Sequence, residues 1–160
     1  MVKEITLTQG KVTVVDDEDY GWLSKWKWCA VNGHNGFHAE SRVGGKHVYI
    51  HRLIMDAQPG QQVDHRDHDG LNNTRCNLRL CTNAENARNQ RKRPGCSSPL
   101  KGVTRTGRRQ NPWMAQITLN RANIYLGCYS TQEAAAKAYD VAAVKYHGEF
   151  ALLNEYLETC

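Results

Sequence analysis

An acid and a histidine stand side by side at Asp64 and His65, and two asparagines follow at Asn77 and Asn86. Asn77 comes twelve residues after His65, and Asn86 comes nine residues after Asn77. Carboxylate and amide oxygens are the hard ligands that Mg²⁺ prefers, and histidine titrates near neutral pH without a large perturbation. These residue types can therefore hold one divalent ion on a phosphate and activate one water molecule beside it.

The elements expected to position these residues are a strand, a turn, a second strand and a helix. Residues 62–65 and 78–81 read as short strands, with a turn at Asp69-Gly70 between them. A helix capped by Thr82 or Asn83 is expected to begin near Ala84.

Each side chain has an expected task in this arrangement. Neighbours on a regular strand point to opposite faces, so a twisted or bulged strand is needed to bring Asp64 and His65 toward one phosphate. Asn86 can offer a second oxygen ligand from the helix. Asn77 can accept a hydrogen bond from His65 and orient its ring.

The residues before this run predict short strands with little helix. The expected elements are a strand at 11–15, a short helix behind the acids at 16–19, a hairpin of 37–41 and 47–50, and a short helix at 51–55. Trp22, Trp26 and Trp28 are interpreted as core residues.

The charge of the chain is unevenly distributed. The net charge is only +5, but no Asp or Glu occurs from Asn86 to Gln132. A long segment of one sign favours a polyanionic partner, although a basic run alone is more often a solvated face. The basic residues of this segment are Arg88, Arg91, Lys92, Arg93, Lys101, Arg105, Arg108, Arg109 and Arg121.

The second half of the chain predicts a small α+β unit behind a linker. Residues 90–99 hold Pro, Gly and Ser together with basic residues, which favour neither helix nor strand. Three strands are expected at 101–105, 113–119 and 123–129, followed by a helix from Gln132 to about His147. Thr131 is expected to cap this helix and Gly148 to end it.

Composition excludes several classes of protein. No run approaches the ~20 consecutive apolar residues of a membrane span, and the first residues lack the apolar core of a signal peptide. The six cysteines form no C-x-x-C pair, which favours free thiols over disulfides or structural zinc. We expect a cytoplasmic protein without a membrane partner.

The motif residues resemble the HNH nuclease family, and most closely its phage and intron-encoded homing-endonuclease branch. The likeness covers roughly residues 45–89 and rests on Val48-Tyr49-Ile50-His51-Arg52-Leu53-Ile54, Asp64-His65, Asn72-Asn73, Asn77-Leu78-Arg79 and Glu85-Asn86. It implies that Asp64 and Asn86 bind Mg²⁺ or Mn²⁺, that His65 is the general base and that Asn77 orients His65. Many HNH enzymes have histidine where this chain has Asn86, but the homing branch has asparagine. A bacterial or phage-infected cell is the implied setting.

Residues 100–154 resemble the AP2 domain of plant transcription factors, whose sheet lies in the major groove of DNA. The likeness rests on Lys101-Gly102-Val103-Thr104-Arg105, Trp113-Met114-Ala115-Gln116-Ile117, Tyr125-Leu126-Gly127-Cys128-Tyr129 and the alanine-rich stretch 134–143. Several DNA-facing positions are arginine in the plant proteins, so their target sequence cannot be carried over. The implied DNA-facing residues are Lys101, Thr104, Gln116, Thr118, Asn123 and Tyr125, and the expected phosphate contacts are Arg105, Arg108, Arg109 and Arg121.

Other readings stay open at this point. A calcium loop of the EF-hand type fails because Arg75 stands where its last glutamate belongs, and a zinc site at His65 and His68 lacks a second ligand pair. His51 either lines the site or packs, and the second unit could bind protein instead of DNA. The arginines that either contact phosphate or are ordinary surface charges are Arg52, Arg66, Arg75 and Arg79.

The sequence thus predicts an α+β enzyme with an HNH ββα-metal unit at 1–89, a basic linker at 90–99 and an AP2-like unit at 100–154. Its expected activity is metal-dependent hydrolysis of phosphodiester bonds in double-stranded DNA, as a monomer or a homodimer. The alternatives are a non-catalytic DNA-binding regulator with a vestigial HNH fold and, less favoured, a structural metal-binding adaptor.

Overall fold

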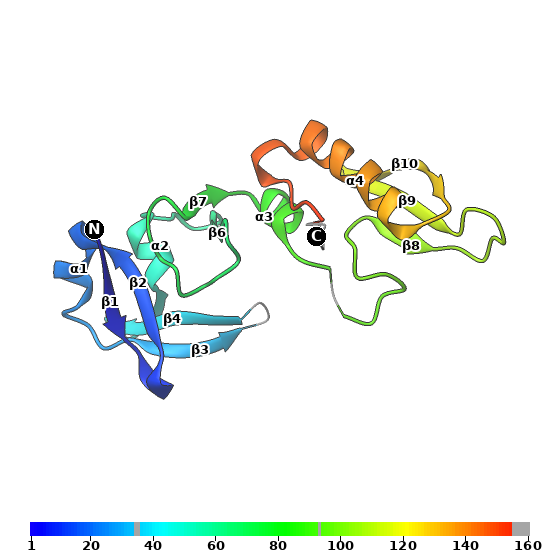
Figure 1. The fold of residues 1–160 in the computed structure, drawn as a ribbon. Helices are drawn as coiled ribbons and strands as arrows, with labels where there is room; N and C mark the ends of the chain where they lie inside the picture. The colour runs from blue at the N-terminus through cyan, green and yellow to red at the C-terminus, as the bar shows by residue number, and fades with distance from the viewer. Residues whose placement is uncertain (34–35, 93, 155–160) are drawn as a thin grey trace. The chain divides into compact units, whose positions relative to one another are not determined.

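The computed structural model describes residues 1–33, 36–92 and 94–154 (Figure 1). Backbone contacts divide the chain into two units, Met1–Asn86 and Ala87–Cys160. Each unit has its own hydrophobic core. The α+β class predicted from the sequence is confirmed, because small antiparallel sheets and short helices make up both units.

The described residues of the first unit form three small antiparallel sheets, whose strands are labelled in Figure 1. The expected hairpin and the strand–strand–helix segment are confirmed, whereas the sequence did not predict β1 or β3. The strands are β1 Val2–Thr6 with β2 Val12–Asp16, then β3 Cys29–Gly33, β4 Gly36–Val43 and β5 Lys46–Tyr49, then β6 Gln62–His65 with β7 Leu78–Cys81. The helices are α1 Asp17–Leu23, α2 Ile50–Ile54 and α3 Asn83–Asn89, the last of which crosses into the second unit, and a 3-10 turn spans Thr8–Gly10.

The core of the first unit gathers side chains from most of these elements. Leu23, Trp28 and Ile50 are buried, and the Trp28 indole donates a hydrogen bond to the Leu23 carbonyl at 2.9 Å. Trp22 and Trp26 are partly buried against the same core. The interpretation of the tryptophans as core residues is confirmed.

Strand β2 anchors the loop that joins β6 to β7. The Val14 amide donates to the Leu71 carbonyl at 2.9 Å, and the Asn73 amide donates to the Val14 carbonyl at 2.8 Å. The Thr13 hydroxyl adds a bond of 2.7 Å to the Leu71 carbonyl. The N-terminal strand pair therefore fixes the loop that follows Asp64 and His65.

The second unit is a three-stranded sheet packed on one helix (Figure 1). Its order is β10-β9-β8, with β8 at Val103–Arg105, β9 at Trp113–Leu119 and β10 at Ala122–Tyr129. Helix α4 spans Gln132–His147, and a 3-10 turn follows at Gly148–Phe150. As expected, the Thr131 hydroxyl accepts from the Ala134 amide at 3.2 Å, and Gly148 follows with φ 55°.

Small residues let α4 lie close to the sheet. Ala135 and Ala136 pack with Val103 and Ala115, while Ala142 and Ala143 pack with Ile117. Gly102 is required at this contact because a Cβ there would lie 1.9 Å from the Tyr139 ring, and its φ is +74°.

The described part of residues 90–99 forms neither helix nor strand. Among the described residues, no helix is long and apolar enough to cross a membrane.

Candidate functional site

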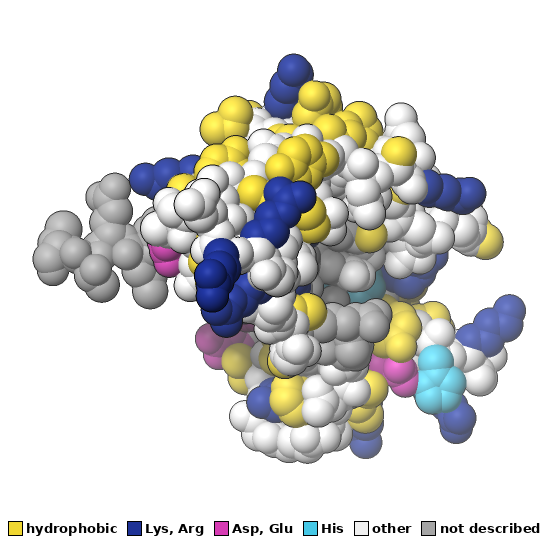
Figure 2. All heavy atoms as spheres, turned by 90° about the vertical axis from the view of Figure 1, so that its right-hand side faces the viewer, with side chains coloured by type: hydrophobic (Ala, Val, Ile, Leu, Met, Phe, Trp, Pro, Cys, Tyr) yellow, Lys and Arg dark blue, Asp and Glu magenta, His cyan; other side chains and the backbone are white. Residues whose placement is uncertain are grey.

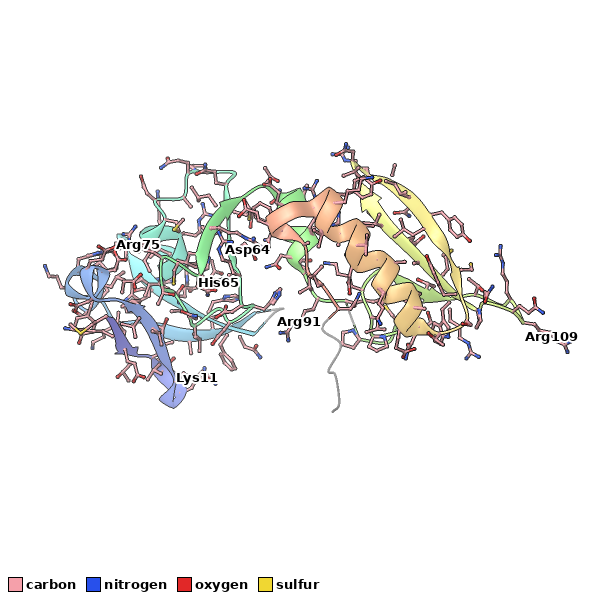
Figure 3. The ribbon with its side chains drawn as sticks, turned by 45° about the horizontal axis from the view of Figure 1, so that its top comes forward. Lys11, Asp64, His65, Arg75, Arg91 and Arg109 are labelled. Carbon is pink, nitrogen blue, oxygen red and sulfur yellow. The ribbon has the colours of Figure 1, made fainter. Side chains whose placement is uncertain are left out.

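Asp64 and Arg79 form a buried ion pair across the β6–β7 ladder. The register places Asp64 opposite Arg79 and His65 opposite Leu78, without a bulge. Both Nε and Nη2 of Arg79 donate to Oδ2 of Asp64, at 2.8 and 2.6 Å. Each residue is 7% exposed, so Arg79 compensates the charge that Asp64 would otherwise carry alone in a buried position. Both Asp64 and His65 lie at the end of β6 (Figure 3).

A neighbouring hydrogen bond determines the tautomer of His65. Its Nε2 lies 3.2 Å from Oδ1 of Asn73. The Asn73 amide nitrogen donates to the Thr13 hydroxyl at 2.8 Å and to the Gly70 carbonyl at 3.2 Å, so its oxygen must face His65. An amide oxygen only accepts hydrogen bonds. Nε2 of His65 therefore carries the hydrogen, and Nδ1 keeps the lone pair.

The side chain of Asn77 has a different task from the one we expected. Its Oδ1 accepts from the Asp67 amide at 3.1 Å, and its Nδ2 donates to Oδ1 of Asp67 and to the Asn72 carbonyl, both at 2.8 Å. The hydrogen bond that His65 was expected to donate to Asn77 is accepted by Asn73 instead. Asn77 acts on the loop around His65, because its carbonyl also accepts from the Arg66 amide at 3.0 Å.

Asp67 and Asp69 shape the turn that follows β6. Oδ1 of Asp67 accepts from the Asp69 amide, and Oδ1 of Asp69 accepts from the Leu71 amide, each at 2.9 Å. Burial acts to raise the pKa of Asp67, but hydrogen bonds from Asp69, Asn72 and Asn77 outweigh it and lower that pKa. Such side-chain bonds to the backbone two residues on are typical of Asx turns.

Two further histidines lie against His65. The ring centroids of His51 and His38 are 5.1 and 6.2 Å from that of His65. Burial lowers the pKa of His65, while the bond to Asn73 and the nearby carboxylates act in the opposite direction. The structure therefore places His51 at the site. Nothing in the sequence singled out His38, which comes from a separate strand.

A capping box begins helix α3 and so positions Asn86. The Thr82 amide donates to Oε2 of Glu85 at 2.7 Å, and the Glu85 amide donates to Oγ1 of Thr82 at 3.2 Å. The Asn86 amide donates to the Thr82 carbonyl at 3.0 Å. Burial and the charges of Asp64 and Glu85 raise the pKa of the neighbouring Cys81 thiol to about 11.

The chemistry of the donor set fits a hydrated divalent ion. No cluster of three His, Cys, Asp or Glu side chains able to hold a metal occurs among the described residues. One carboxylate and one amide oxygen, completed by phosphate and water, is the kind of set that Mg²⁺ accepts.

The arginines near the site have mostly structural partners. Arg75 binds Asp19 through Nε and Nη2, both at 2.8 Å, and its amide donates to Asp16. Arg52 donates to the carbonyls of residues 57, 58 and 61. Arg52, Arg75 and buried Arg79 therefore stabilise the fold through these partners. Arg66 is exposed.

In the second unit, alternation along the strands separates two faces of the sheet. Trp113, Ala115, Ile117, Ile124 and Leu126 pack toward α4, as predicted. The opposite face carries exposed Thr118, Asn123 and Tyr125 and partly buried Gln116, with Tyr125 paired to Gln116 and Asn123 paired to Thr118. The Thr118 hydroxyl donates to Oδ1 of Asn123 at 2.7 Å.

Basic side chains border this face. Arg105, Arg108, Arg109 and Arg121 are exposed, and Thr104 is partly buried. Arg109 extends from the loop between β8 and β9 (Figure 3). Lys and Arg side chains stand out from the surface in Figure 2, where acidic side chains are sparse.

Lys101 differs from the other basic residues. Its ammonium group donates to the carbonyls of Arg88 and Gln90, the latter at 2.6 Å. Burial lowers its pKa to about 8. The structure thus gives Lys101 a role inside the unit that the sequence did not predict.

Known proteins share both parts of this arrangement. Residues 48–88, which contain β6, β7 and most of α3, match the HNH endonuclease family. An uncharacterized HNH endonuclease of Acanthamoeba polyphaga mimivirus is 32% identical over 151 residues, which is 92% of this chain and 76% of the viral protein. The chain belongs to the HNH endonuclease family.

The second unit is similar to the AP2 domains of plant proteins, which also pack a three-stranded sheet on a helix. An AP2-like ethylene-responsive transcription factor of Arabidopsis thaliana is 48% identical over 67 residues, and one of Oryza sativa subsp. japonica is 47% identical over 60 residues. Each match covers 36% of this chain but only 22% and 9% of the plant proteins.

Proposed function

We propose that this protein is a metal-dependent DNA endonuclease of the homing type. The observation that carries the proposal is the hydrogen bond between His65 and Asn73, because it leaves Nδ1 of His65 as a proton acceptor next to Asp64 on the chain. Membership of the HNH endonuclease family supports the same chemistry.

Asp64 and Asn86 are the residues that would hold Mg²⁺ or Mn²⁺. When bound, the ion would neutralise charge on the scissile phosphate and on the departing oxygen. Arg79 would orient the Asp64 carboxylate, since it donates two hydrogen bonds to one of its oxygens.

His65 acts as the general base of the reaction. Its Nδ1 takes a proton from a water molecule, and the water oxygen forms a bond to phosphorus. The bond from phosphorus to the 3′ oxygen then breaks, the 3′ oxygen takes a proton from solvent, and the phosphate stays on the 5′ end. Asn73 holds the imidazole in the tautomer that this step needs, and Asn77 holds the loop that carries Asn73.

The second unit would hold the target in double-stranded DNA. The supporting observations are the likeness to AP2-like transcription factors and a sheet face with exposed polar side chains and a border of arginines. The residues assigned to this contact are Thr104, Arg105, Arg108, Arg109, Gln116, Thr118, Arg121, Asn123 and Tyr125, with Lys101 supporting the fold. We keep 1–89, 90–99 and 100–154 as the proposed nuclease unit, linker and DNA-binding unit.

The test is cleavage of a supercoiled plasmid library by the purified protein with Mg²⁺ or Mn²⁺, followed by mapping of the ends. We expect metal-dependent nicks or breaks with 5′ phosphates, and loss of cleavage in His65→Ala. If the wild type binds DNA but never cuts it with either ion, the protein is a DNA-binding regulator with a vestigial nuclease fold.

A further inference from the structure

Among the described residues of the first unit, the imidazole rings of His38, His51 and His65 lie together, although only His65 has a task in the proposed reaction. His38 comes from β4, His51 from α2 and His65 from β6. The centroid of His51 lies 5.1 Å from that of His65 with the rings nearly perpendicular, at 80°. Tyr49 stacks on His51 at 5.5 Å with an angle of 14° between the rings. Tyr49 and His65 therefore fix the ring of His51 from two sides.

The two nitrogens of His51 have different surroundings. Nδ1 is buried and has no hydrogen-bond partner among the described residues. Nε2 forms no hydrogen bond within the described parts of the chain and, unlike Nδ1, is partly accessible to solvent. A buried N–H without an acceptor is rarer in proteins than an unpaired acceptor. The hydrogen of the neutral ring is therefore expected on Nε2.

A histidine at this position is poorly explained by packing alone. A phenyl ring would fill the same space without an unpaired nitrogen, and a buried polar atom without a partner costs about 1–3 kcal/mol. Unpaired buried groups of this kind call for a reason outside stability. Nδ1 of His38 is also buried without a partner among the described residues, but this ring packs against Gly70, where a Cβ would lie 2.3 Å from it.

His51 is held in its neutral form. Burial is the main cause that lowers its pKa to about 3, and the neighbouring His65, His38 and Arg52 add to the effect. A charged imidazolium next to His65 would disfavour protonation of His65. A neutral ring avoids this repulsion while still offering an N–H donor toward solvent.

We infer that His51 is a second substrate-contacting residue of the nuclease centre, which donates its Nε2 hydrogen to a non-bridging oxygen of the phosphate to be cut. The inference rests on the proposed nuclease function and assigns a further residue to it. The contact lies beside the base, so it acts on the phosphate that receives the water molecule activated by His65.

The test compares three substitutions in the full chain. His51→Phe keeps the ring but removes the donor, His51→Gln places an amide N–H near the position of Nε2, and His51→Asn places one near Nδ1. We expect His51→Phe to lower the rate of plasmid cleavage at saturating DNA about 10- to 100-fold, the effect of one hydrogen bond to a charged group. His51→Gln is expected to recover part of this loss, and His51→Asn none. His47→Gln, at an exposed histidine bonded to Arg42, is the matched control and should cleave like the wild type.

The inference is overturned if His51→Phe folds and cleaves at the wild-type rate, since packing would then explain the residue. Histidine-ring ¹⁵N spectra of the wild type in EDTA, with and without a short duplex of random sequence, give a readout that needs no cleavage. We expect a hydrogen on Nε2 of His51 whose signal shifts when duplex is added, and an unchanged signal contradicts the contact. Failure of the wild type to cut any DNA would overturn the proposed function, whereas these spectra decide the phosphate contact separately.

Discussion

Asn73 accepts a hydrogen bond from Nε2 of His65 at 3.2 Å, and its own amide hydrogens are taken up by Thr13 and Gly70. The side chain is fully buried, with 0% exposed. Three partners thus give Asn73 a single orientation, in which it determines the tautomer of His65.

The first prediction concerns this orientation. We expect Asn73→Ala to lower the cleavage rate about 10- to 100-fold, as loss of an orienting partner typically does, and to destabilise the first unit by about 1–3 kcal/mol. Single-turnover cleavage assays measure the change in rate, and chemical denaturation measures the change in stability.

Asn77→Ala is the matched comparison for Asn73→Ala. It removes the bonds to Asp67 and Asn72 but leaves the bond that Asn73 makes to His65. Ring ¹⁵N shifts should therefore show a mixture of His65 tautomers in Asn73→Ala and one tautomer in Asn77→Ala. The reverse result would return the orienting role to Asn77.

The second prediction concerns the buried pair of Asp64 and Arg79. Arg79→Ala leaves a buried carboxylate without its partner, and we expect a loss of about 3–5 kcal/mol in the free energy of unfolding. Arg79→Lys should recover only part of this, because an ammonium group cannot reproduce the guanidinium geometry. Urea titrations of the full chain measure both changes.

Lys3→Ala is the control for Arg79→Ala, because it breaks an exposed ion pair with Asp17 and should change stability little. Combining Asp64→Leu with Arg79→Leu should restore much of the stability while abolishing cleavage. Equal stability of Arg79→Ala and the wild type would show that the pair contributes nothing in solution.

The hydrogen bond between Asn73 and His65 and the ion pair of Asp64 and Arg79 show which parts of the site the sequence could predict. Local patterns sufficed for β6, β7 and the capped helix α3, because turn residues and the Thr82–Glu85 capping box act within a few positions. The choice between Asn73 and Asn77 depends on Thr13, which lies 60 residues from Asn73 along the chain. A sequence pattern holds no such information, since the contact arises only when β2 packs on the loop.

The same limit applies to His38, Arg79 and Lys101. Register between two strands pairs Asp64 with Arg79, and the fold of a separate sheet brings His38 to His65. The sequence indicated that Lys101 contacts DNA, like the other basic residues of its segment. In the structure, its ammonium group donates hydrogen bonds to the carbonyls of Arg88 and Gln90. In each case, spacing along the chain indicates the residue type and tertiary contact decides its partner.

The third prediction concerns acid stability and His51. Its pKa is lowered from the ordinary 6.5 to about 3 by burial, so the unfolded chain takes up the proton at higher pH than the folded chain. The unfolded state therefore binds more protons between these values, and stability falls as pH decreases through this window. One such group contributes a slope approaching ~1.4 kcal/mol per pH unit.

Substitution of His51 tests this contribution. Denaturant unfolding between about pH 7 and about pH 5 should show a flatter dependence in His51→Phe than in the wild type. The pKa values of His65 and His38 are also lowered by burial, so some pH dependence should remain in the variant. Identical slopes for the two proteins would mean that His51 is not held neutral by the fold.

The last prediction separates two basic residues of the second unit by the salt dependence of DNA binding. Arg109 is exposed in the loop between β8 and β9, whereas the Lys101 ammonium group donates to two backbone carbonyls. Each phosphate contact contributes about 0.9 to the slope of log affinity against log salt. We expect Arg109→Gln to reduce the slope by about this amount. Lys101→Gln should leave the slope unchanged while destabilising the unit.

Fluorescence anisotropy of a labelled duplex over a KCl series measures the slope. If Lys101→Gln reduced it as much as Arg109→Gln, the Lys101 ammonium group would leave its carbonyl partners to bind phosphate.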